Sequence, residues 1–271
     1  MAGDPGWVPP GVDTTRANTA RVYDYWLGGT HNFLPDQDLA RAIVAVNPFM
    51  RDIVRANRAF LSRAVRFLAA QGITQFLDIG SGIPTQGNVH EVAQQASPGA
   101  RVVYADTDPV AIAHSKAILA GNPGAAIIDA DLREPDKILG HDVTGRLLDL
   151  SQPTALILGA VLHFIGDEED PAGIVAALRD GLAPGSYLVV SHATEDESAG
   201  LVQASGKVYN SKSTVRLRMR SYPEVCRFFD GFELVEPGVT WLPLWRPDSP
   251  ADVPADPSRY AGWVGAGRKP G

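Results

Sequence analysis

An acid and two glycines follow a short apolar run in the segment Asp78-Ile79-Gly80-Ser81-Gly82, and their spacing suits ligand binding. Residues 73–79 are predicted to form a buried strand, because the run is short, apolar and bounded by glycines. Gly80 permits a sharp turn, and Gly82 lets a ligand approach the backbone closely, because neither carries a Cβ. Ligands of open parallel sheets bind beyond the carboxyl ends of the strands. The spacing therefore predicts a ligand-binding turn between a strand and a helix.

Two known glycine motifs fit this turn poorly, and a catalytic pair that often accompanies a dinucleotide site is incomplete. A phosphate-binding P-loop needs Lys and Ser or Thr where Asn88 and Val89 stand, and a dinucleotide fingerprint needs Gly in place of Thr85. The Tyr-x-x-x-Lys pair of short-chain reductases is absent, since Lys212 lies one residue too close to Tyr209. The acid-x-Gly-x-Gly form is instead similar to the S-adenosylmethionine (SAM) loop of Rossmann-like methyltransferases. A turn that binds no ligand remains the structural alternative.

Acids also end the next two predicted strands. The strand at 101–105 runs into Asp106 and Thr107, and the strand at 125–128 runs into Asp131 and Leu132. A carboxylate at the end of the second strand can accept hydrogen bonds from both ribose hydroxyls, a feature shared by SAM and NAD sites. A carboxylate at the end of the third strand can reach the exocyclic amine of an adenine. Each acid alone is explained as a helix cap, but acids at three successive strand ends favour a bound nucleoside.

Candidate catalytic residues lie at two further places. His163 follows the predicted strand at 154–158 and would sit, with Ala160, at the edge of the cofactor and substrate pocket; the alternative is a half-buried histidine in a turn. Tyr23 precedes the helix stop at Gly28-Gly29 and could close over the ligand, contacting a sulfonium by cation–π attraction. Core packing is the competing interpretation for Tyr23. His31 is a second candidate base.

The elements that must position these residues change character at residue 73. Helices are predicted at 14–27, after Pro35 and at 49–70, and an alternation of strands and helices follows. Such alternation predicts an α/β fold: a Rossmann-like, doubly wound, mostly parallel seven-stranded sheet with an N-terminal helical cap. The last two strands, 232–236 and 260–268, are expected to form an antiparallel C-terminal hairpin. The predicted organisation is a loose tail at 1–13, a helical cap at 14–72 over the active face, and a single catalytic domain at 73–271.

Three segments outside this core carry further expectations. Residues 194–213 are polar and serine-rich, which predicts a surface loop over the active face. The alternating arginines of Arg216-Leu-Arg-Met-Arg220 are interpreted as an exposed edge kept soluble by charge, or else as a site for an anionic substrate. Four arginines of the third helix are expected to face solvent, although Arg58 could turn inward; they are Arg51, Arg55, Arg58 and Arg66.

Composition narrows the function classes. The 271 residues include 24 Lys and Arg against 31 Asp and Glu, a formal net charge of −7, which disfavours nucleic acid and anionic membranes as partners. The single cysteine, Cys226, excludes an internal disulfide. The six histidines form no pair at metal-ligand spacing, so no metal is expected. Without a signal-peptide pattern or a run long enough to span a bilayer, a cytoplasmic protein is expected.

The order of these segments resembles class I SAM-dependent methyltransferases. More narrowly, the chain resembles a bacterial, mostly actinomycete, family of predicted S-adenosyl methyltransferases formerly catalogued as a domain of unknown function. Residues 20–32, 57–61, 75–85, 106–109 and 262–270 carry this narrower likeness, which covers roughly residues 16–270. Pro84 replaces the third glycine of the general methyltransferase loop, and the narrower family tolerates proline there.

The resemblance implies SAM as the cofactor and S-adenosylhomocysteine as the product. Gly80–Gly82 would hold the amino-acid and adenosine side of SAM, Asp106 the ribose, and Asp131 with Leu132 the adenine, while Asp78 would orient the loop or the SAM amino group. The full expected binding set is Tyr23, Gly29, Asp78, Gly80, Ser81, Gly82, Pro84, Asp106, Thr107, Asp131, Leu132, Ala160 and His163. No base is assigned; the candidates are His163, His31 and Tyr23.

Methyl transfer from SAM to a small molecule is the leading hypothesis. A SAM-binding regulator, or a degenerate methyltransferase without transfer activity, is the alternative, because obvious bases are few. An NAD(P)-dependent oxidoreductase is disfavoured by Thr85 and by the missing Tyr-x-x-x-Lys. The sequence specifies neither the acceptor nor the oligomeric state.

Overall fold

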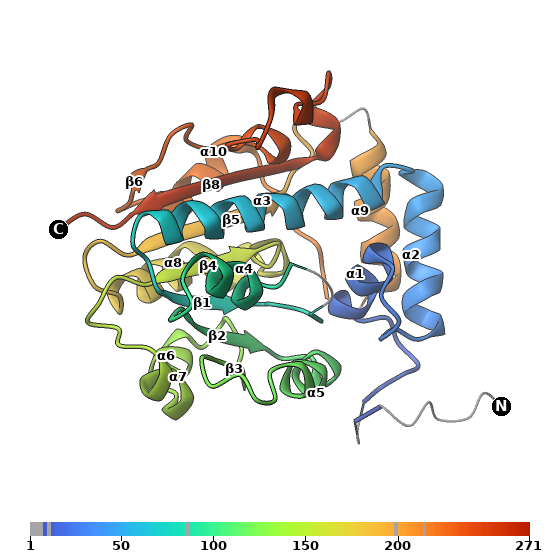
Figure 1. Cartoon of the computed structure of the whole chain (residues 1–271). Helices are drawn as coiled ribbons and strands as arrows, with labels where there is room; N and C mark the ends of the chain where they lie inside the picture. Colours follow the sequence, from blue (N-terminus) through green and yellow to red (C-terminus); the bar gives the residue numbers. More distant parts are fainter. Residues whose placement is uncertain (1–7, 10–11, 85–86, 198–199, 214) are drawn as a thin grey trace.

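Three helices open the chain, as the sequence predicts. The computed structural model describes residues 8–9, 12–84, 87–197, 200–213 and 215–271, so most of the predicted tail at 1–13 lies outside the described residues. The three helices are α1 (Thr19–Leu27), α2 (Leu34–Val46) and α3 (Met50–Ala70). Figure 1 shows the long helix α3 lying along the sheet, whereas α1 and α2 stand beside one end of it.

Helix α1 begins five residues later than predicted, at Thr19 rather than at residue 14. The cause is Asn18, whose side-chain oxygen accepts hydrogen bonds from the backbone N–H groups of Ala20 (2.8 Å) and Arg21 (3.4 Å). An asparagine cap of this kind satisfies N–H groups that lack partners in the first turn. At the other end Gly28 adopts φ 85°, and the helix stops where the sequence predicts.

The sheet is mostly parallel, and the order of its strands reverses beside β1. Strands β1 (Gln75–Ile79), β2 (Arg101–Asp106), β3 (Ala125–Asp129), β4 (Ala155–Gly159) and β5 (Tyr187–Ala193) pair in parallel within the order β3-β2-β1-β4-β5-β8-β6. The chain winds outward from β1 to β3 and then crosses back to β4. The carboxyl ends of β1 and β4 therefore meet at a topological switch point, the usual place for a ligand in such sheets.

The C-terminal strands pair antiparallel, as predicted. Strand β8 (Gly262–Arg268) lies between β5 and the edge strand β6 (Glu233–Leu234). The described sheet has eight strands rather than seven, because β7 (Thr240–Trp241) also pairs with β8. A strand of two residues gives no periodic signal, so the sequence analysis did not find it.

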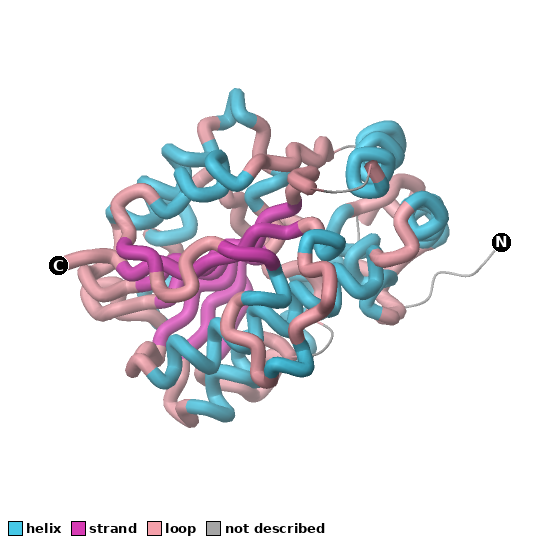
Figure 2. The backbone as a smooth tube through the Cα atoms, turned by 90° about the horizontal axis from the view of Figure 1, so that it is seen from above, coloured by secondary structure: helices cyan, strands magenta, loops and turns pink. Residues whose placement is uncertain are grey.

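Helices cover both faces of the sheet, which Figure 2 shows from above. They are α4 (Val89–Ala96), α5 (Pro109–Ile118), α6 (Pro135–Leu139), α7 (Asp142–Leu147), α8 (Pro171–Asp180) and α10 (Tyr222–Cys226). Alternate residues of β1 point to opposite faces, so Phe76 packs in one hydrophobic core with Phe60 of α3, and Leu77 packs in the other with Leu178 of α8. Helix α3 therefore buries its apolar face against the sheet itself.

The prediction of a polar surface loop at 194–213 was wrong. Residues Leu201–Lys212 form helix α9, which packs against α2 and places Tyr209 in a hydrophobic cluster with Trp26 and Ile43. The buried face of α9 consists of Ser205, Gly206 and Tyr209. Because two of these three residues are small or polar, the face lacks the apolar stripe from which an amphipathic helix is normally predicted. None of the described helices is long and apolar enough to cross a membrane.

Candidate functional site

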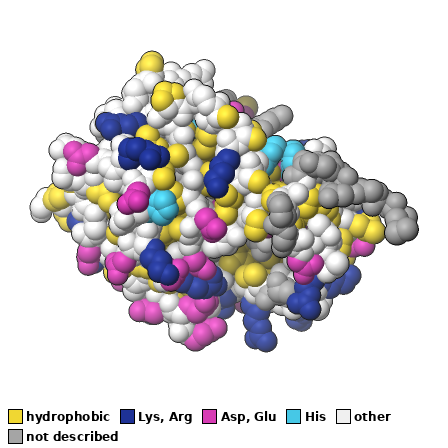
Figure 3. Space-filling view, turned by 90° about the horizontal axis from the view of Figure 1, so that it is seen from below, with side chains coloured by type: hydrophobic (Ala, Val, Ile, Leu, Met, Phe, Trp, Pro, Cys, Tyr) yellow, Lys and Arg dark blue, Asp and Glu magenta, His cyan; other side chains and the backbone are white. Residues whose placement is uncertain are grey.

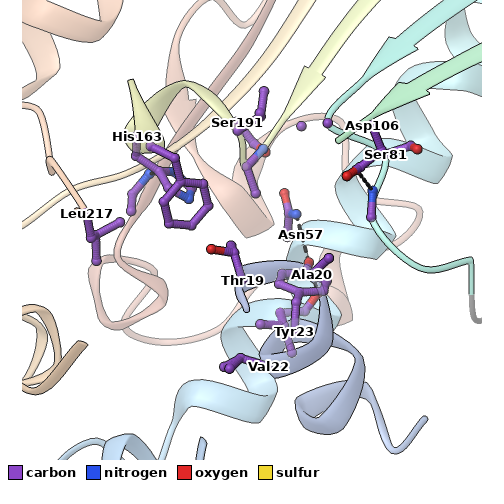
Figure 4. Close-up of a pocket in the computed structure, with 18 of the residues that line it drawn as sticks. Thr19, Ala20, Val22, Tyr23, Asn57, Ser81, Asp106, His163, Ser191 and Leu217 are labelled. Atoms are coloured by element: carbon purple, nitrogen blue, oxygen red, sulfur yellow. Dashed lines mark hydrogen bonds between the residues drawn. The ribbon is translucent and has the colours of Figure 1, made fainter. Parts of the chain in front are cut away.

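A cavity of about 320 Å³ lies at the carboxyl ends of the strands, next to the switch point. The sheet side is formed by the turns that follow β1, β2, β3 and β4, and the opposite side by α1, α3, Tyr209 of α9 and Leu217. Figure 4 shows side chains from both sides pointing into the same space. A cavity of this size is within the range of small-molecule sites.

The structure brings most of the predicted binding residues to this cavity. Its lining includes Tyr23, Gly80, Ser81, Gly82, Asp106, Thr107, Asp131, Leu132, Ala160 and His163. Asp78 and Pro84 instead line a small neighbouring cavity behind the glycine turn. Gly29 and His31 are absent from the lining of both cavities among the described residues.

The turn after β1 is held open by its two glycines. Gly80 and Gly82 have φ angles of 71° and 66°, in the region that side chains rarely adopt. A Cβ on Gly80 would overlap the Val161 side chain, so the close approach of the β1 and β4 turns requires glycine. A Cβ on Gly82 would meet no protein atom within 4 Å and would enter open space. The backbone at Gly82 thus leaves room that a ligand can fill.

Asp106 ties the turn after β1 to the turn after β2. Its Oδ2 accepts a hydrogen bond from the Gly82 N–H at 2.7 Å (Figure 4), and its Oδ1 accepts from the N–H groups of Thr107 (2.8 Å) and Asp108 (2.9 Å). Burial raises the pKa of Asp106, and these backbone N–H groups oppose that rise. A carboxylate with three such bonds retains acceptor capacity for a ligand hydroxyl.

The acid after β3 is held by a neighbouring arginine. Asp131 Oδ1 accepts hydrogen bonds from the backbone N–H of Arg133 (2.9 Å) and from its Nη1 (3.2 Å), and Arg133 also pairs with Glu169. The aspartate is half-buried at the rim of the cavity beside Leu132. This geometry fixes a carboxylate and an apolar side chain at the third strand end.

The turn after β4 has an unusual backbone. Ala160 has φ 56°, and its N–H is held by both the carbonyl oxygen (3.0 Å) and Oγ (2.9 Å) of Ser191. A non-glycine residue in this region is strained, and strain of this kind clusters at ligand sites. The strained turn carries the chain past Val161 into the short helix that contains His163.

His163 is buried and faces the cavity, but its ring is a poor base. Its Nδ1 accepts a hydrogen bond from the Ala193 N–H at 3.3 Å, which leaves the ring proton on Nε2. Burial, with His192 and Arg220 nearby, lowers the pKa of His163 well below its ordinary value. The neutral ring can therefore donate a hydrogen bond into the cavity from Nε2, and it resists protonation.

His192 and Arg220 lie behind His163 in a buried polar cluster. His192 donates from Nδ1 to its neighbour's carbonyl (Ala193 O, 2.7 Å) and accepts at Nε2 from Arg220 (3.1 Å). Arg220 also bonds the carbonyl oxygens of Leu162 and Ile165 and the Asp167 carboxylate. The interpretation of residues 216–220 as an exposed edge was therefore wrong for Arg220, which is 3% exposed.

Sequence reasoning missed Asn57, which faces the cavity from α3. Its Nδ2 donates to the Tyr23 hydroxyl at 2.9 Å, and that hydroxyl donates to the Val54 carbonyl at 3.2 Å. Its Oδ1 is buried and has no hydrogen-bond partner among the described residues, and the same is true of Ser81 Oγ. Buried polar atoms without partners are rare and point to a missing ligand.

The same reasoning missed a hydroxyl pair, formed by Thr19 and Tyr209 at 2.6 Å, which links α1 to α9 across the cavity wall. Tyr209 was considered only as half of a reductase motif. Tyr209 lies four residues after Ser205, which is a helical spacing. The signal is weak because the other buried residues of α9 are serine and glycine.

Three predicted residues have other surroundings. Asp78 is buried and its pKa is raised to about 7 by burial, although nearby Arg58 opposes the rise; the partly buried Arg58 bonds the Gly87 carbonyl. Gly29 lies against the Asp24 carboxylate, where a Cβ would overlap it. The His31 ring packs against the His114 ring at a tilt of 35°, with a centroid distance of 3.6 Å. His31 is thus placed away from the cavity in which it was expected to act as a base.

The residues at the cavity fit SAM. The Asp106 carboxylate suits ribose hydroxyls, the open side of Gly82 leaves space for a close ligand, and two buried polar atoms await partners. Among the described residues, no group of three His, Cys, Asp or Glu side chains could hold a metal ion.

A doubly wound sheet with a glycine turn after β1 and an acid after β2 is the arrangement of Rossmann-like, SAM-dependent methyltransferases. Within that class, the chain belongs to the S-adenosyl methyltransferase family, whose sequence profile matches residues 5–270. It is a SAM-dependent methyltransferase whose acceptor is unidentified, and NAD(P) as the cofactor is set aside.

Solved structures agree with this family. The chain is similar to a presumed methyltransferase from Thermobifida fusca YX, with 42% identity, a TM-score of 0.92, and coverage of 98% of this chain and 99% of that chain. It is also similar to a DUF574 family protein from Streptomyces avermitilis MA-4680, with 39% identity, a TM-score of 0.91, and coverage of 95% and 99%.

A more distant likeness extends to the N-methyltransferase NodS from Bradyrhizobium japonicum WM9, solved with S-adenosyl-L-homocysteine. Its TM-score is 0.51 at 15% identity, covering 87% of this chain and 98% of that chain, which shows the shared fold alone. None of the curated proteins compared with the chain matches it significantly.

Proposed function

We propose that the chain methylates a small molecule that it encloses between the sheet and the helices α1, α3 and α9. The observation that carries this proposal is the cavity itself, because residues from both ends of the chain line one cavity next to the turns proposed to bind SAM. A macromolecular acceptor would need an open approach to the methyl group. On the face shown in Figure 3, basic and acidic side chains are interspersed, so that face presents no basic patch for a nucleic-acid acceptor.

In this proposal the strand-end turns hold SAM. The backbone of Gly80–Gly82 and the Ser81 hydroxyl contact its amino-acid side, Asp106 and Thr107 its ribose, and Asp131 and Leu132 its adenine. When bound, SAM supplies a methyl group already activated for transfer. The protein's own task is then to hold an acceptor atom in line with that group and to exclude water.

Residues outside the cavity support this arrangement. Asp78 and Pro84 shape the far side of the glycine turn, where they share the small second cavity with Ser81 and Gly82. Gly29 follows the end of α1 at Gly28 and lies beside Asp24, whose Oδ2 accepts from the His31 N–H (3.0 Å) and from Asn32 Nδ2 (2.8 Å). These contacts position α1, and with it Tyr23, against the cavity.

We further propose that residues 14–72 and 73–271 form one catalytic unit, in which α3 packs on the sheet and α9 packs on α2. The single cysteine, Cys226, is compatible with a cytoplasmic location, which is part of the proposal.

Isothermal titration calorimetry tests the cofactor site. The wild-type protein should bind both SAM and S-adenosylhomocysteine, and replacement of Asp106 by alanine should weaken both strongly. Absence of binding at millimolar ligand would refute the proposal.

A further inference from the structure

The two sides of the cavity differ in charge. The side formed by the strand-end turns carries Asp106, Asp108, Asp131 and Arg133. Arg58 of α3 also lines the cavity, and its guanidinium bonds the Gly87 carbonyl beyond the glycine turn. The opposite side, which we call the helical wall, consists of Val22 and Trp26 of α1, Ile53 and Val54 of α3, Tyr209 of α9, and Leu217. The helical wall carries no charged side chain. Since SAM occupies the strand-end turns in the proposed function, the helical wall is left for the acceptor.

A charged acceptor would lose its hydration against the helical wall without gaining a partner. Burial of an unpaired charge is among the most costly events in a protein interior. The two histidines that line the cavity, His163 and His192, are buried and neutral, because burial lowers the pKa of both. The wall therefore selects an acceptor that is uncharged and largely apolar.

The described part of the cavity also holds no side chain arranged as a general base. The Nδ1 lone pair of His163 is directed to the Ala193 N–H, and both ring nitrogens of His192 are engaged. Asp106 and Asp108 accept backbone N–H groups, and Asp131 is paired with Arg133. A general base must be within hydrogen-bond reach of the proton that it removes. An alcohol or phenol, which must lose its proton during transfer, is poorly served here.

Two buried oxygen atoms at this cavity lack a hydrogen-bond partner among the described residues: Ser81 Oγ on the glycine turn and Asn57 Oδ1 on α3. Asn57 is 6% exposed, its Nδ2 is engaged by the Tyr23 hydroxyl, and its Oδ1 has no partner among the described residues. Figure 4 shows the Asn57 side chain between Tyr23 and Ser191, with the dashed line to Tyr23 fixing its orientation. An amide oxygen accepts a hydrogen bond but does not take the proton, so it suits a donor that stays protonated.

We propose that the methyl acceptor is an uncharged, largely apolar amine that donates its N–H to Oδ1 of Asn57. This inference rests on the proposed function, because it places SAM at the strand-end turns. The hydrogen bond holds the N–H against α3 and leaves the nitrogen lone pair free to point elsewhere in the cavity. Such an amine needs no base, since its nucleophilic lone pair is present without deprotonation.

The transfer step balances without a further reactant. The nitrogen lone pair forms the new N–C bond while the carbon–sulfur bond breaks, and the electrons of that bond stay on sulfur. The positive charge passes from sulfur to nitrogen, which becomes a methylated ammonium. That ammonium is disfavoured beside the helical wall, leaves the cavity, and loses its proton to water.

Four ring compounds of similar shape test the charge and atom preferences. They are tetrahydroquinoline (an uncharged amine), tetrahydronaphthol (an uncharged phenol), tetrahydronaphthoate (an anion) and tetrahydroisoquinoline (a cation at neutral pH). The protein is first saturated with S-adenosylhomocysteine, and binding of each probe is measured by saturation-transfer NMR and calorimetry. The two uncharged probes should bind at least about tenfold more tightly than the two ions. With SAM, only tetrahydroquinoline should be methylated.

Variants of Asn57 test the hydrogen bond. Asn57→Leu should weaken tetrahydroquinoline binding about five- to tenfold, as expected for one lost hydrogen bond, with S-adenosylhomocysteine affinity within about twofold of wild type. Asn57→Asp keeps the shape but adds a negative charge, and should bring tetrahydroisoquinoline to the level of the uncharged probes. Tyr23→Phe is the matched control, because it removes the same Asn57–Tyr23 bond but retains Oδ1; its loss of tetrahydroquinoline binding should be less than about threefold.

Three results would overturn the inference. They are binding of an ion as tight as that of the uncharged probes, no binding of any probe, or methylation of the phenol as fast as the amine. If Asn57→Leu weakens S-adenosylhomocysteine and leaves tetrahydroquinoline unchanged, Oδ1 faces the ammonium of SAM and the acceptor assignment is wrong. Failure of the wild-type protein to bind S-adenosylhomocysteine would instead refute the proposed function, so the two failures are distinguishable.

Discussion

Replacement of Asp106 by asparagine removes the negative charge and one acceptor oxygen from the carboxylate that joins the turns after β1 and β2. The carboxylate accepts three backbone N–H groups, one from Gly82 at 2.7 Å and two from Thr107 and Asp108 at 2.8 and 2.9 Å. An amide has a single oxygen. When that oxygen serves Thr107 and Asp108, the amide NH₂ faces the Gly82 N–H, and two donors oppose each other.

The expected losses follow from this geometry. An N–H left without its acceptor costs about 1–3 kcal/mol, and the half-buried position of Asp106 places the loss in unfolding free energy at the lower end, about 1–2 kcal/mol. A ligand loses more, because a hydrogen bond to a charged group contributes about 1.5–3 kcal/mol. The affinity for S-adenosylhomocysteine should therefore fall about 10- to 150-fold.

Calorimetry with S-adenosylhomocysteine measures the affinity, and urea unfolding of the ligand-free protein measures the stability. Asp129→Asn is the matched control, because Asp129 also ends a strand but is exposed and is not among the residues that line the cavity. The control should keep wild-type affinity. An Asp106→Asn protein that binds as tightly as the control would show that the carboxylate does not contact the ribose.

Three further predictions concern the walls of the cavity. Gly80→Ala should destabilise the fold by more than about 1–2 kcal/mol, because it adds the cost of a positive φ to an overlap with Val161; in urea unfolding, adding Val161→Ala should recover only the part of the overlap that the Val161 methyl groups make, since the Val161 Cβ would still lie 2.7 Å from the new Cβ. Tyr209→Phe and Thr19→Val should each cost about 1 kcal/mol, and the double variant should cost less than their sum, since both remove one 2.6 Å hydrogen bond. When the pH is lowered from 6 to 5, the unfolding free energy of the His192→Gln variant should fall less than that of the wild type. The difference should be up to about 1.4 kcal/mol per pH unit. Burial holds the pKa of His192 at about 3, below its ordinary 6.5, so unfolding of the wild type takes up a proton in this range and stability falls as the pH falls; equal slopes would contradict the assignment.

The sheet and its strand ends could be predicted because their signals are local. A short apolar run followed by Gly80 or by Asp106 identifies both the strand and the direction in which it ends, and parallel pairing brings such ends to one edge. The order of elements along the chain then implies the switch point. Nine of the ten predicted binding residues that line the cavity follow strand ends and lie there for this reason, whereas Tyr23 comes from α1; the contact of all ten with SAM stays a prediction.

The residues that were missed depend on packing between distant segments. Asn57 lies on the buried face of α3, and only the positions of Tyr23 and of the cavity distinguish it from a core residue. Arg220 resembles an exposed charge in sequence, yet it is buried because the carbonyls of Leu162 and Ile165 accept its hydrogen bonds. Such partners come from segments more than fifty residues away, and no local pattern reveals them.

The helical wall gives a physical reason for the assembly of this cavity from both ends of the chain. A bare doubly wound sheet exposes its strand ends, and acids there would face water. Helices α1 and α3 come from the N-terminal region and α9 from beyond β5, and the Thr19–Tyr209 bond joins them. Because α9 packs on α2, a change in either segment alters the space opposite the SAM turns. In the proposed function, variation on this wall changes the acceptor, while the acids at the strand ends, on the other side of the cavity, continue to bind the cofactor.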